Sequence, residues 1–352
     1  MKNSLETFIT GLADLQNHIH GLEIESRLLL APVDENTSPL LVQLQGLASR
    51  LIGKRQIFNY NSVIISLYGF LEPFIESLIS KYLNFLNTIV PNYEELPEPI
   101  KKNHIELSFG LINRIQQARY SGTMTVAQVV SNIHACLNNP NHYQLNDEAF
   151  TYHTANFRAD VIMETFARIG VENVSMRIKK CPTFTQYLTS LDENRDVEMM
   201  SLEEAFFYLN DLVERRNEVA HGARTELLPN DMLLSYLKFF KAYGQALYEV
   251  VQSETLSYET KYRGIPLGKP LKVWQKGTVV CLSVKNISIK VGDFLIAKIS
   301  TATLPYLKGE IQEIQINKIS YNKSQATATE IIVCLKVTFK ATKNQSFFLI
   351  PQ

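Results

Sequence analysis

The period of the hydrophobic pattern changes once along this chain, near residue 262, and the change divides the sequence into two regions. Before it, apolar residues recur at the three- and four-residue spacing of amphipathic helices. Beyond it, short β-branched runs alternate with turn signals, as in a small all-β domain. A segment rich in turn-forming residues separates the two: Gly264, Pro266, Gly268 and Pro270. We therefore expect an all-helical domain over 1–258, a linker over 259–270 and a β-barrel over 271–352.

The most apolar stretch of the helical region, residues 57–86, raises the question of a membrane span. Polar residues and a proline interrupt it: Asn59, Asn61, Glu72, Pro73 and Glu76. A core helix is therefore the better interpretation. At the N-terminus an amphipathic helix is followed by polar Asn17, His18 and His20, which is not the pattern of a signal peptide. We expect a cytoplasmic protein with no membrane contact.

Composition limits the kinds of site that the chain can carry. Its 352 residues suit about two domains, and 35 basic residues balance 35 acidic ones. Because the net charge is zero, a site for a polyanion must be local. The four cysteines are scattered without a Cys-x-x-Cys pair: Cys136, Cys181, Cys281 and Cys334. They indicate neither a zinc site nor a disulfide framework, and small buried hydrophobes in a reducing cytoplasm are favoured.

Residues 201–222 place polar groups where a buried helix face should be apolar. Ser201 and Glu204 form a capping box, and Gly222 can supply a left-handed C-cap. Between them an apolar stripe recurs at helical spacing: Leu202, Ala205, Phe206, Leu209, Leu212 and Val213. The same steps continue onto four more positions: Arg216, Asn217, Ala220 and His221. Buried ionisable groups are costly unless paired or used. This stripe therefore ends in either an ion-paired core with a satisfied histidine or a functional site.

The hexamer Arg216-Asn217-Glu218-Val219-Ala220-His221 is an arginine, four residues and a histidine, with a polar residue directly after the arginine. It resembles the signature of the HEPN superfamily of RNases and RNA-binding proteins. Two other segments resemble one HEPN-like nuclease family of bacterial conflict operons. They are Tyr60-Asn61 with Ser66-Leu67-Tyr68-Gly69-Phe70-Leu71-Glu72, and Asn156-Phe157-Arg158. The resemblance covers residues 1–258 and implies that Arg216 and His221 are catalytic, with Asn217 supporting them.

Three further residues are candidate supporting groups: Glu72, Arg158 and Arg215. Glu72 shares a helix face with Glu76, four residues on, and a solvated pair is the alternative interpretation. Arg158 is either a phosphate-side residue or an ordinary surface arginine. A basic cluster is either a solvated face or a contact for RNA backbone: Arg177, Lys179 and Lys180.

The resemblance implies a metal-independent endoribonuclease. In RNA the 2′-hydroxyl is the nucleophile, histidine is a suitable base near neutral pH, and arginine stabilises the charge of the transition state. Asn217 can orient His221, because residues four apart share a helix face. We expect a 2′,3′-cyclic phosphate product and no metal or cofactor. The implied role is a toxin or abortive-infection effector against phage, regulated by an antitoxin or another operon-encoded partner. The alternative is a catalytically inactive HEPN-type scaffold that binds RNA or a protein.

The spacing of Arg216 and His221 predicts a homodimer. Residues five apart diverge by about 140° on an ideal helix, so one helix does not present both to a single phosphate. Two copies about a two-fold axis can place both sets around one cleft, and HEPN RNases are known as a family for such composite sites.

The C-terminal region predicts strands over five segments: 278–284, 294–299, 310–316, 331–339 and 346–350. Residues 291–296, 309–314 and 331–337 resemble the small second-domain β-barrel of translation GTPases. No P-loop occurs, so the chain is not itself a GTPase, and such barrels serve as adaptors. Six lysines form either a surface that blunts strand edges or a docking face: Lys308, Lys318, Lys323, Lys336, Lys340 and Lys343.

Overall fold

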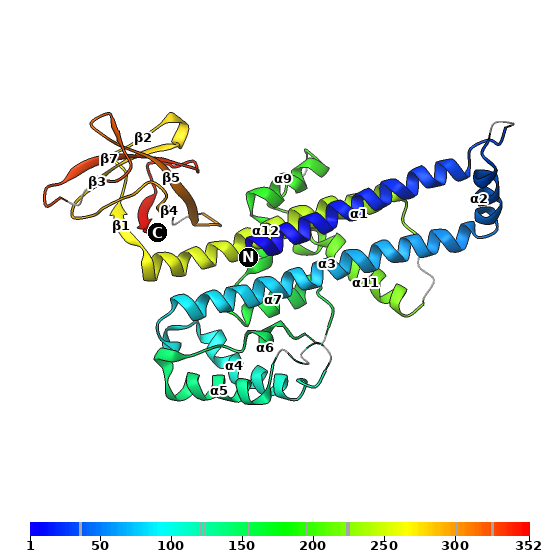
Figure 1. The fold of residues 1–352 in the computed structure, drawn as a ribbon, viewed down its shortest axis with the longest axis horizontal. Helices are drawn as coiled ribbons and strands as arrows, with labels where there is room; N and C mark the ends of the chain where they lie inside the picture. The colour runs from blue at the N-terminus through cyan, green and yellow to red at the C-terminus, as the bar shows by residue number, and fades with distance from the viewer. Residues whose placement is uncertain are drawn as a thin grey trace. The chain divides into compact units, whose positions relative to one another are not determined.

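A computed structural model of the chain describes residues 1–34, 37–117, 119, 122, 124–153, 155–194, 196–222, 226–299, 302–324 and 327–352. Helices come first and strands follow, which confirms the predicted order (Figure 1). The helices are α1 (Lys2–Leu29), α2 (Pro39–Ser49), α3 (Ile52–Ile89), α4 (Glu98–Ile112), α5 (Val126–Asn138), α6 (Asp147–Thr151), α7 (Ala159–Ala167), α8 (Val174–Lys179), α9 (Pro182–Leu191), α10 (Leu202–Ala205), α11 (Phe207–Ala220) and α12 (Asn230–Arg263). The strands are β1 (Ile265–Gly268), β2 (Lys272–Trp274), β3 (Val279–Val284), β4 (Phe294–Lys298), β5 (Tyr306–Ile316), β6 (Ile319–Tyr321), β7 (Ile331–Val337) and β8 (Ser346–Ile350).

The chain divides into two compact units, and α3 and α12 each begin in the first and end in the second. Unit 1 comprises Met1–Lys81, Lys102–Leu111 and Asp147–Tyr248. Unit 2 comprises Tyr82–Lys101, Ile112–Asn146 and Glu249–Gln352.

The predicted linker, 259–270, is for the most part regular structure. Helix α12 runs on to Arg263, and β1 begins at Ile265. A Cβ at Gly264 would lie 2.5 Å from the carbonyl oxygen of Thr260, so only glycine fits where the helix ends. Pro266 is tolerated because β1 is the end strand of the sheet.

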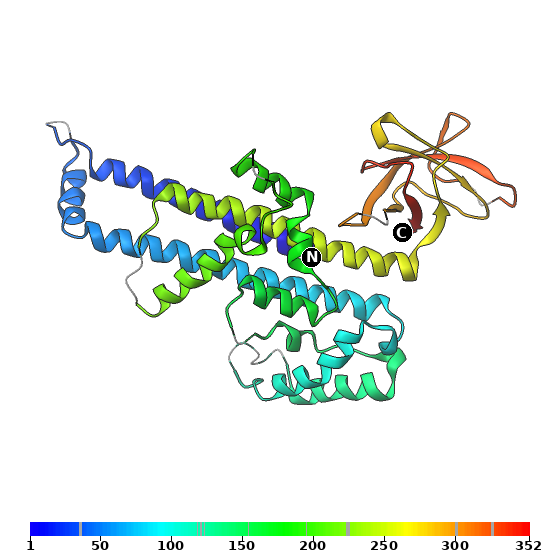
Figure 2. The same cartoon turned by 180° about the vertical axis from the view of Figure 1, so that it is seen from behind.

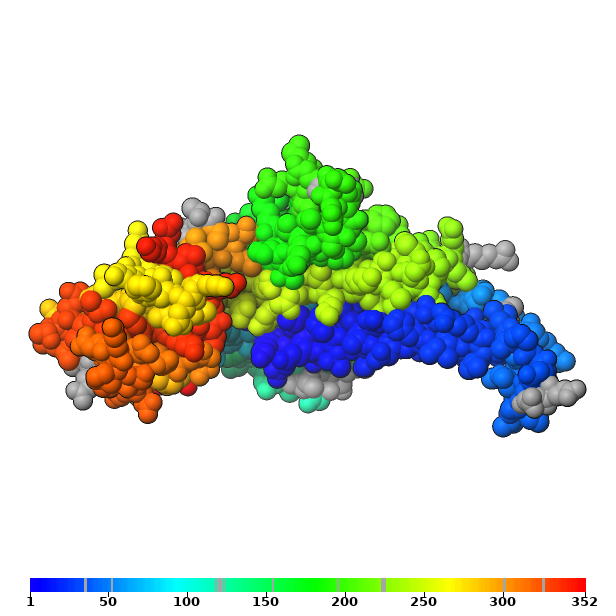
Figure 3. All heavy atoms as spheres, turned by 90° about the horizontal axis from the view of Figure 1, so that it is seen from above, coloured from blue at the N-terminus to red at the C-terminus, as the bar shows by residue number. Residues whose placement is uncertain are grey.

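In unit 1, α1 and the first part of α12 lie side by side, and Figure 3 shows them in blue and yellow-green. One face of α1 is buried: Leu5, Phe8, Leu12, Leu15 and Ile19. The Phe8 ring stacks on Phe74 of α3 with centroids 4.5 Å apart. A Cβ at Gly244 of α12 would lie 2.5 Å from Phe8 Cε1. The lack of a side chain at Gly244 therefore lets α12 pack directly on this ring.

Helix α3 is the one described helix that is long and apolar enough to cross a membrane by length and composition. Half of the residues in its most apolar 18-residue stretch are buried inside the protein. Residues along one face of the helix have no exposed surface, among them Leu67, Leu71, Ile75 and Leu78. This burial fits the predicted core helix.

The capping box of Ser201 and Glu204 is confirmed, and so is the left-handed conformation of Gly222, at φ 68°. The single predicted helix, however, is interrupted at Phe206, so that α10 and α11 are separate. Phe206 packs against Phe184 and Tyr243, which hold its buried ring where the chain turns. Beyond Val213 the stripe leaves the core, because Arg216 and Asn217 are half-buried and His221 is exposed.

Unit 2 contains one antiparallel sheet with the order β1-β8-β4-β5-β7-β3-β2, and β6 pairs with β5. Its end strands β1 and β2 do not pair with each other, so the sheet is an open half-barrel, seen from the other side in Figure 2. The prediction of a closed β-barrel was wrong in this respect. Strands β1 and β2 have only four and three residues, too few to complete a closing ladder. The five predicted strands are present, and the three shortest, β1, β2 and β6, were not predicted.

The prediction that the cysteines form no disulfide was wrong for one pair. Cys281 of β3 and Cys334 of β7 are direct register partners, with Cα atoms 4.0 Å apart, and their sulfurs are bonded. They are 53 residues apart in sequence, and only the strand register brings them together. Cys136 and Cys181 are buried, as predicted.

Within unit 2, the end of α12 packs against the sheet. Leu256 contacts Ile296 and Ile350, and both carboxylate oxygens of Glu259 accept from Lys308 Nζ, at 2.7 and 2.8 Å. Lys308 is therefore engaged with the helix rather than part of an exposed surface. The other five lysines of the predicted docking face are exposed.

Candidate functional site

Arg216 and Asn217 of α11 meet Tyr68 of α3 and Asn156 in unit 1, and we name these four residues the Arg216–Asn217 cluster. The Arg216 guanidinium lies 5.2 Å from the centroid of the Tyr68 ring. Asn217 Oδ1 accepts from Arg216 Nη1 at 3.3 Å and from Asn156 Nδ2 at 2.5 Å. The Tyr68 hydroxyl donates to Asn156 Oδ1 at 3.3 Å. Hydrogen bonds and the aromatic ring thus hold Arg216 in one orientation.

The connection between α6 and α7, residues 152–158 without residue 154, completes this cluster because α11 offers it polar groups on one face. Asn210 Oδ1 accepts from the backbone N–H of Ala159 at 3.1 Å, at the start of α7. Glu214 pairs with Arg158 at 3.6 Å, and Asn217 binds Asn156. Positions 210, 214 and 217 share a face at helical spacing. Helix α11 therefore positions the connection as well as carrying the motif.

Tyr68 is a neutral hydrogen-bonding group in this cluster. Burial raises the pKa of Tyr68 to about 12, although a hydrogen bond from Phe157 N–H and the charge of Arg216 act in the opposite direction. Phe157 N donates to the Tyr68 hydroxyl at 3.2 Å. The phenol therefore keeps its proton near neutral pH and can donate to Asn156.

Arg215 faces a different set of partners, which we name the Arg215 network. Its Nε donates to Asp211 Oδ2 at 2.6 Å, and its Nη1 donates to the Tyr60 hydroxyl and the Glu226 carbonyl, both at 3.0 Å. Tyr236 also contacts Arg215 and donates to Asp211. Burial lowers the pKa of Arg215, but these hydrogen bonds outweigh it and raise the pKa above its ordinary value. Arg215 therefore directs its donors into the protein.

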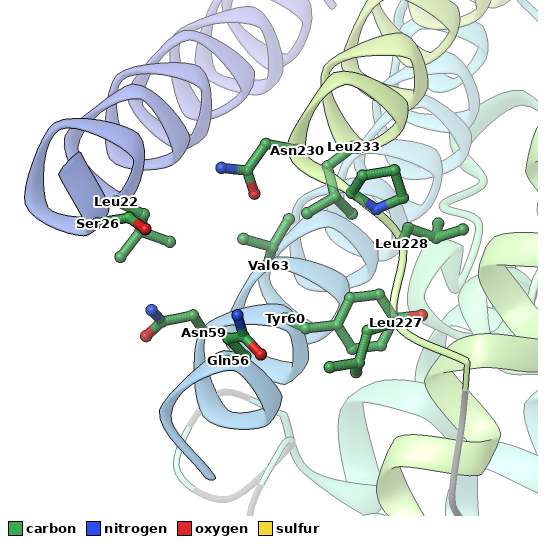
Figure 4. Close-up of a pocket in the computed structure, with 11 residues that line it drawn as sticks. Leu22, Ser26, Gln56, Asn59, Tyr60, Val63, Leu227, Leu228, Asn230 and Leu233 are labelled. Carbon is green, nitrogen blue, oxygen red and sulfur yellow. The ribbon is translucent and has the colours of Figure 1, made fainter. Parts of the chain in front are cut away.

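The Arg215 network borders a cavity of about 330 Å³ between α1, α3 and the start of α12 (Figure 4). Its wall combines apolar side chains such as Val63 and Leu233 with the amides of Gln56, Asn59 and Asn230. None of the described residues that line it is charged. The cavity therefore lacks the cations that a phosphate site needs.

His221 lies at the C-terminal end of α11 with its side chain exposed. Its backbone N–H donates to the carbonyl of Asn217 at 3.0 Å. In the described part of the chain, no hydrogen bond or ion pair joins its imidazole to Arg216 or Asn217. The structure thus brings Arg216 and Asn217 together within one protomer but leaves His221 apart from them.

The remaining predicted basic residues differ in their surroundings. Arg158 lines a hollow of about 430 Å³ together with Glu214, and its side chain is 44% exposed. In the predicted basic cluster, Lys179 is buried and donates to the carbonyls of Glu198 and Met200. The expectation of a solvated or RNA-contacting run is therefore wrong for Lys179. Lys180 is exposed.

Glu72 belongs to a second polar group, one that contains a residue the sequence did not single out. His153 Nε2 lies 3.2 Å from Glu72 Oε1 and 3.5 Å from Glu76 Oε1, while Nδ1 bonds to the Ala155 carbonyl at 2.7 Å. Burial lowers the pKa of His153, but the hydrogen bonds outweigh it and raise the pKa to about 9. His153 lies three positions before Asn156, and that proximity is the only signal in the sequence.

These three residues, the Glu72–Glu76–His153 group, also have the donor set of a metal site. Their ligand atoms all lie within 4.8 Å of one another. Tyr68 and Glu72 are four residues apart on α3, so the group adjoins the Arg216–Asn217 cluster.

A comparison with protein-family models connects these features to a known family. The model described as RiboL-PSP-HEPN, of HEPN type, matches residues 40–253, more than half of the chain. The match includes α3, the 152–158 connection and α11, and it confirms the resemblance that the hexamer of α11 carries. Neither the curated proteins nor the solved structures gave a match. The likeness of the C-terminal sheet to a translation-factor domain rests on its sequence segments alone. The chain belongs to the HEPN_RiboL-PSP family.

Proposed function

We propose that this protein is an endoribonuclease of HEPN type whose site is built from Arg216, Asn217 and His221. The observation that carries the proposal is the fixed guanidinium of Arg216. It is held by Asn217 and the Tyr68 ring on the helix that ends in an exposed histidine. A fixed cation is what a transferring phosphate requires, because its charge grows in the transition state.

In the proposed reaction the substrate supplies the nucleophile. His221 takes the proton of a 2′-hydroxyl, and Arg216 stabilises the charge that develops on the phosphate oxygens. The 2′-oxygen bonds to phosphorus as the bond to the 5′-oxygen breaks, and the leaving 5′-oxygen takes a proton from water. The products are therefore a 2′,3′-cyclic phosphate and a 5′-hydroxyl, and no metal takes part.

Asn217 has a role in this proposal that differs from the one expected from the sequence. Its side-chain oxygen accepts from Arg216 and Asn156, so it positions the arginine rather than the histidine. It acts on the reaction through Arg216.

A second copy of the chain completes the proposed site. Within one protomer Arg216 and His221 diverge by about 140° around α11, and their side chains do not meet. Apolar side chains are exposed on α2, on the connection after it and on the first turns of α3: Leu40, Leu44, Leu47, Leu51, Ile57 and Phe58. Such a surface supports a two-fold interface that includes α3.

The test is cleavage of a mixed RNA pool by purified protein in EDTA, with the product ends identified. Wild type should yield 2′,3′-cyclic phosphates, and His221→Ala should not, while the exposed control variant His20→Ala should retain the wild-type rate. Equal cleavage by wild type and His221→Ala would reject the proposal. Mixing Arg216→Ala and His221→Ala protomers tests the composite site, because a heterodimer should recover part of the activity.

The biological role that we propose is a toxin or abortive-infection effector regulated by an operon-encoded partner. Expression of wild type in a bacterial host should slow growth and degrade RNA, and His221→Ala should do neither. If His221→Ala still inhibits growth, the toxicity does not come from RNA cleavage at this site.

One observation favours the second candidate function, an inactive scaffold that binds RNA or a protein. His221 makes no side-chain contact with Arg216 or Asn217 among the described residues. Under this alternative, RNA binding by wild type and His221→Ala would be equal, and neither would cleave.

A further inference from the structure

We infer that Glu72, Glu76 and His153 form a binding site for one divalent transition-metal ion, such as Zn²⁺ or Mn²⁺. The ion would hold the 152–158 connection against α3. This inference goes beyond the proposed function and does not depend on it, because the ion takes no part in RNA cleavage.

The distances between the donor atoms suit a shared metal ion. Carboxylate and imidazole ligands bind Zn²⁺ at about 2.1 Å, which places neighbouring ligand atoms about 3.0 Å apart at right angles and about 3.4 Å apart in a tetrahedron. His153 Nε2 lies 3.2 Å from Glu72 Oε1 and 3.5 Å from Glu76 Oε1. An ion can therefore bind all three residues with small rotations of their side chains.

The fold fixes the three ligands from two directions. Glu72 and Glu76 are one turn apart on α3, so their carboxylates project from the same face. His153 comes from the 152–158 connection, and its ring lies against Phe157 with centroids 4.0 Å apart. Helix α3 thus positions the two carboxylates, and the contacts of the His153 ring orient the imidazole towards them, as a metal site requires.

The hydrogen bond of His153 Nδ1 shows which nitrogen of the imidazole is available to bind a metal ion. His153 Nδ1 lies 2.7 Å from the carbonyl oxygen of Ala155, an acceptor outside the group. Nδ1 must therefore carry a proton, and Nε2 is left to face the two carboxylates. Histidines that bind metals commonly donate their other N–H in this way, which sets the ring's orientation.

Charge and exposure also fit a cation. Two carboxylates converge on one nitrogen, so a positive species must lie between them, either the proton of His153 or a metal ion. The side chains of Glu72, Glu76 and His153 are 33%, 15% and 12% exposed. An ion can enter from the Glu72 side and keep water at its remaining positions. One nitrogen and two oxygen ligands suit Zn²⁺ or Mn²⁺ better than a softer, thiolate-seeking ion.

The expected consequence is positional. Asn156 follows His153 by three residues and binds both Tyr68 and Asn217. An ion at the Glu72–Glu76–His153 group would therefore restrict the segment that orients the Arg216–Asn217 cluster. Binding only to the folded state should also raise the unfolding temperature.

The test uses the full chain without an affinity tag, stripped with EDTA and then titrated with ZnCl₂ or MnCl₂ by calorimetry. Metal content after gel filtration gives the stoichiometry. Wild type should bind about one ion per chain, with a raised unfolding temperature. His153→Gln and Glu76→Gln should each weaken binding at least about tenfold, in line with the loss of a ligand or its support. The matched controls should bind as wild type does: His134→Gln, which is exposed on α5, and Glu23→Gln, which is half-buried on α1.

Two outcomes would overturn the inference: no binding by wild type above the level of a His153→Gln/Glu76→Gln double variant, or equal loss in the control variants. Circular dichroism of each variant shows whether it is folded. If His153→Gln or Glu76→Gln misfolds, Glu72→Gln is a third variant that removes one ligand. None of these measurements depends on RNA cleavage. An absence of metal binding would therefore not count against the proposed nuclease, and an absence of cleavage would not count against the metal site.

Discussion

Arg215 and Arg216 are neighbours in the sequence, yet the two sides of α11 use them differently. Arg215 lies in a network with Asp211, Tyr60 and Tyr236 that joins α11 to α3 and α12. Arg216 lies over the Tyr68 ring and donates to Asn217, beside the 152–158 connection. Successive residues are rotated by about 100° around a helix axis, so the two side chains point in different directions. Two neighbouring arginines can therefore differ in role: Arg215 holds the fold, and Arg216, under the proposed function, stabilises the reacting phosphate.

The largest effect that we predict concerns the Arg216 side. Arg216→Ala should lower the rate of RNA cleavage by roughly 100- to 10,000-fold, the range in which single catalytic groups act. Its unfolding temperature should change little, because Arg216 makes no ion pair among the described residues. Cleavage kinetics and thermal unfolding on the same preparation test this. A loss of stability as large as that of an Arg215 variant would remove the distinction between the two sides.

Two histidines also differ in their surroundings, because His104 is fully buried and His221 is exposed. Burial lowers the pKa of His104 to about 4, from 6.5 in an unfolded chain. On acidification the unfolded state therefore binds the proton first. The stabilisation is complete above about pH 6.5 and is lost as pH falls towards 4, at a cost of roughly 3 kcal/mol.

Denaturant unfolding of wild type and His104→Gln at pH 7 and pH 4.5 measures this loss. The variant should lose less stability than wild type between the two pH values. Equal losses would show that His104 is not the group responsible. His221→Ala, which removes an exposed histidine, serves as the control.

A smaller effect is expected on the Arg215 side. Arg215→Met should lower the free energy of unfolding by about 2 kcal/mol, because Asp211 would keep only Tyr236 as a partner among the described residues. Cleavage measured well below the unfolding temperature should fall far less than in Arg216→Ala. Chemical denaturation gives the stability, and an activity loss equal to that of Arg216→Ala would place both arginines in the site.

The smallest predicted effect is that of Tyr68→Phe. The change keeps the ring under Arg216 but removes the hydroxyl that binds Asn156 and Phe157. We expect a loss of about 1 kcal/mol in stability, as for a single buried hydrogen bond. Tyr68→Leu, which removes the ring as well, should reduce cleavage further. Identical activities in the two variants would show that the ring does not support Arg216.

The features that could be predicted from the sequence are those that depend on residues close together in the chain. The capping box at Ser201, the left-handed Gly222 and the five longer strands follow from local spacing and turn chemistry. The HEPN signature is also contiguous, so its family could be identified from a hexamer and two short segments.

The features that sequence did not predict depend on contacts between distant segments. His153 meets Glu72 and Glu76 across more than 70 positions, and no period marks it. Cys281 and Cys334 pair because of a strand register that spacing does not encode. The open edge of the sheet and the different partners of Arg215 and Arg216 likewise follow only from the assembled fold.

The Arg216–Asn217 cluster draws its residues from three segments that the ribosome makes at widely separated times. Tyr68 is synthesised first, Asn156 follows, and Asn217 comes 149 positions after Tyr68. At about 5–20 residues per second, roughly 7–30 s pass between the first and the last. A nascent chain therefore cannot hold Arg216 in place until α11 has left the exit tunnel. Under the proposed function, the nuclease site therefore cannot assemble before the first 217 of the 352 residues have been made.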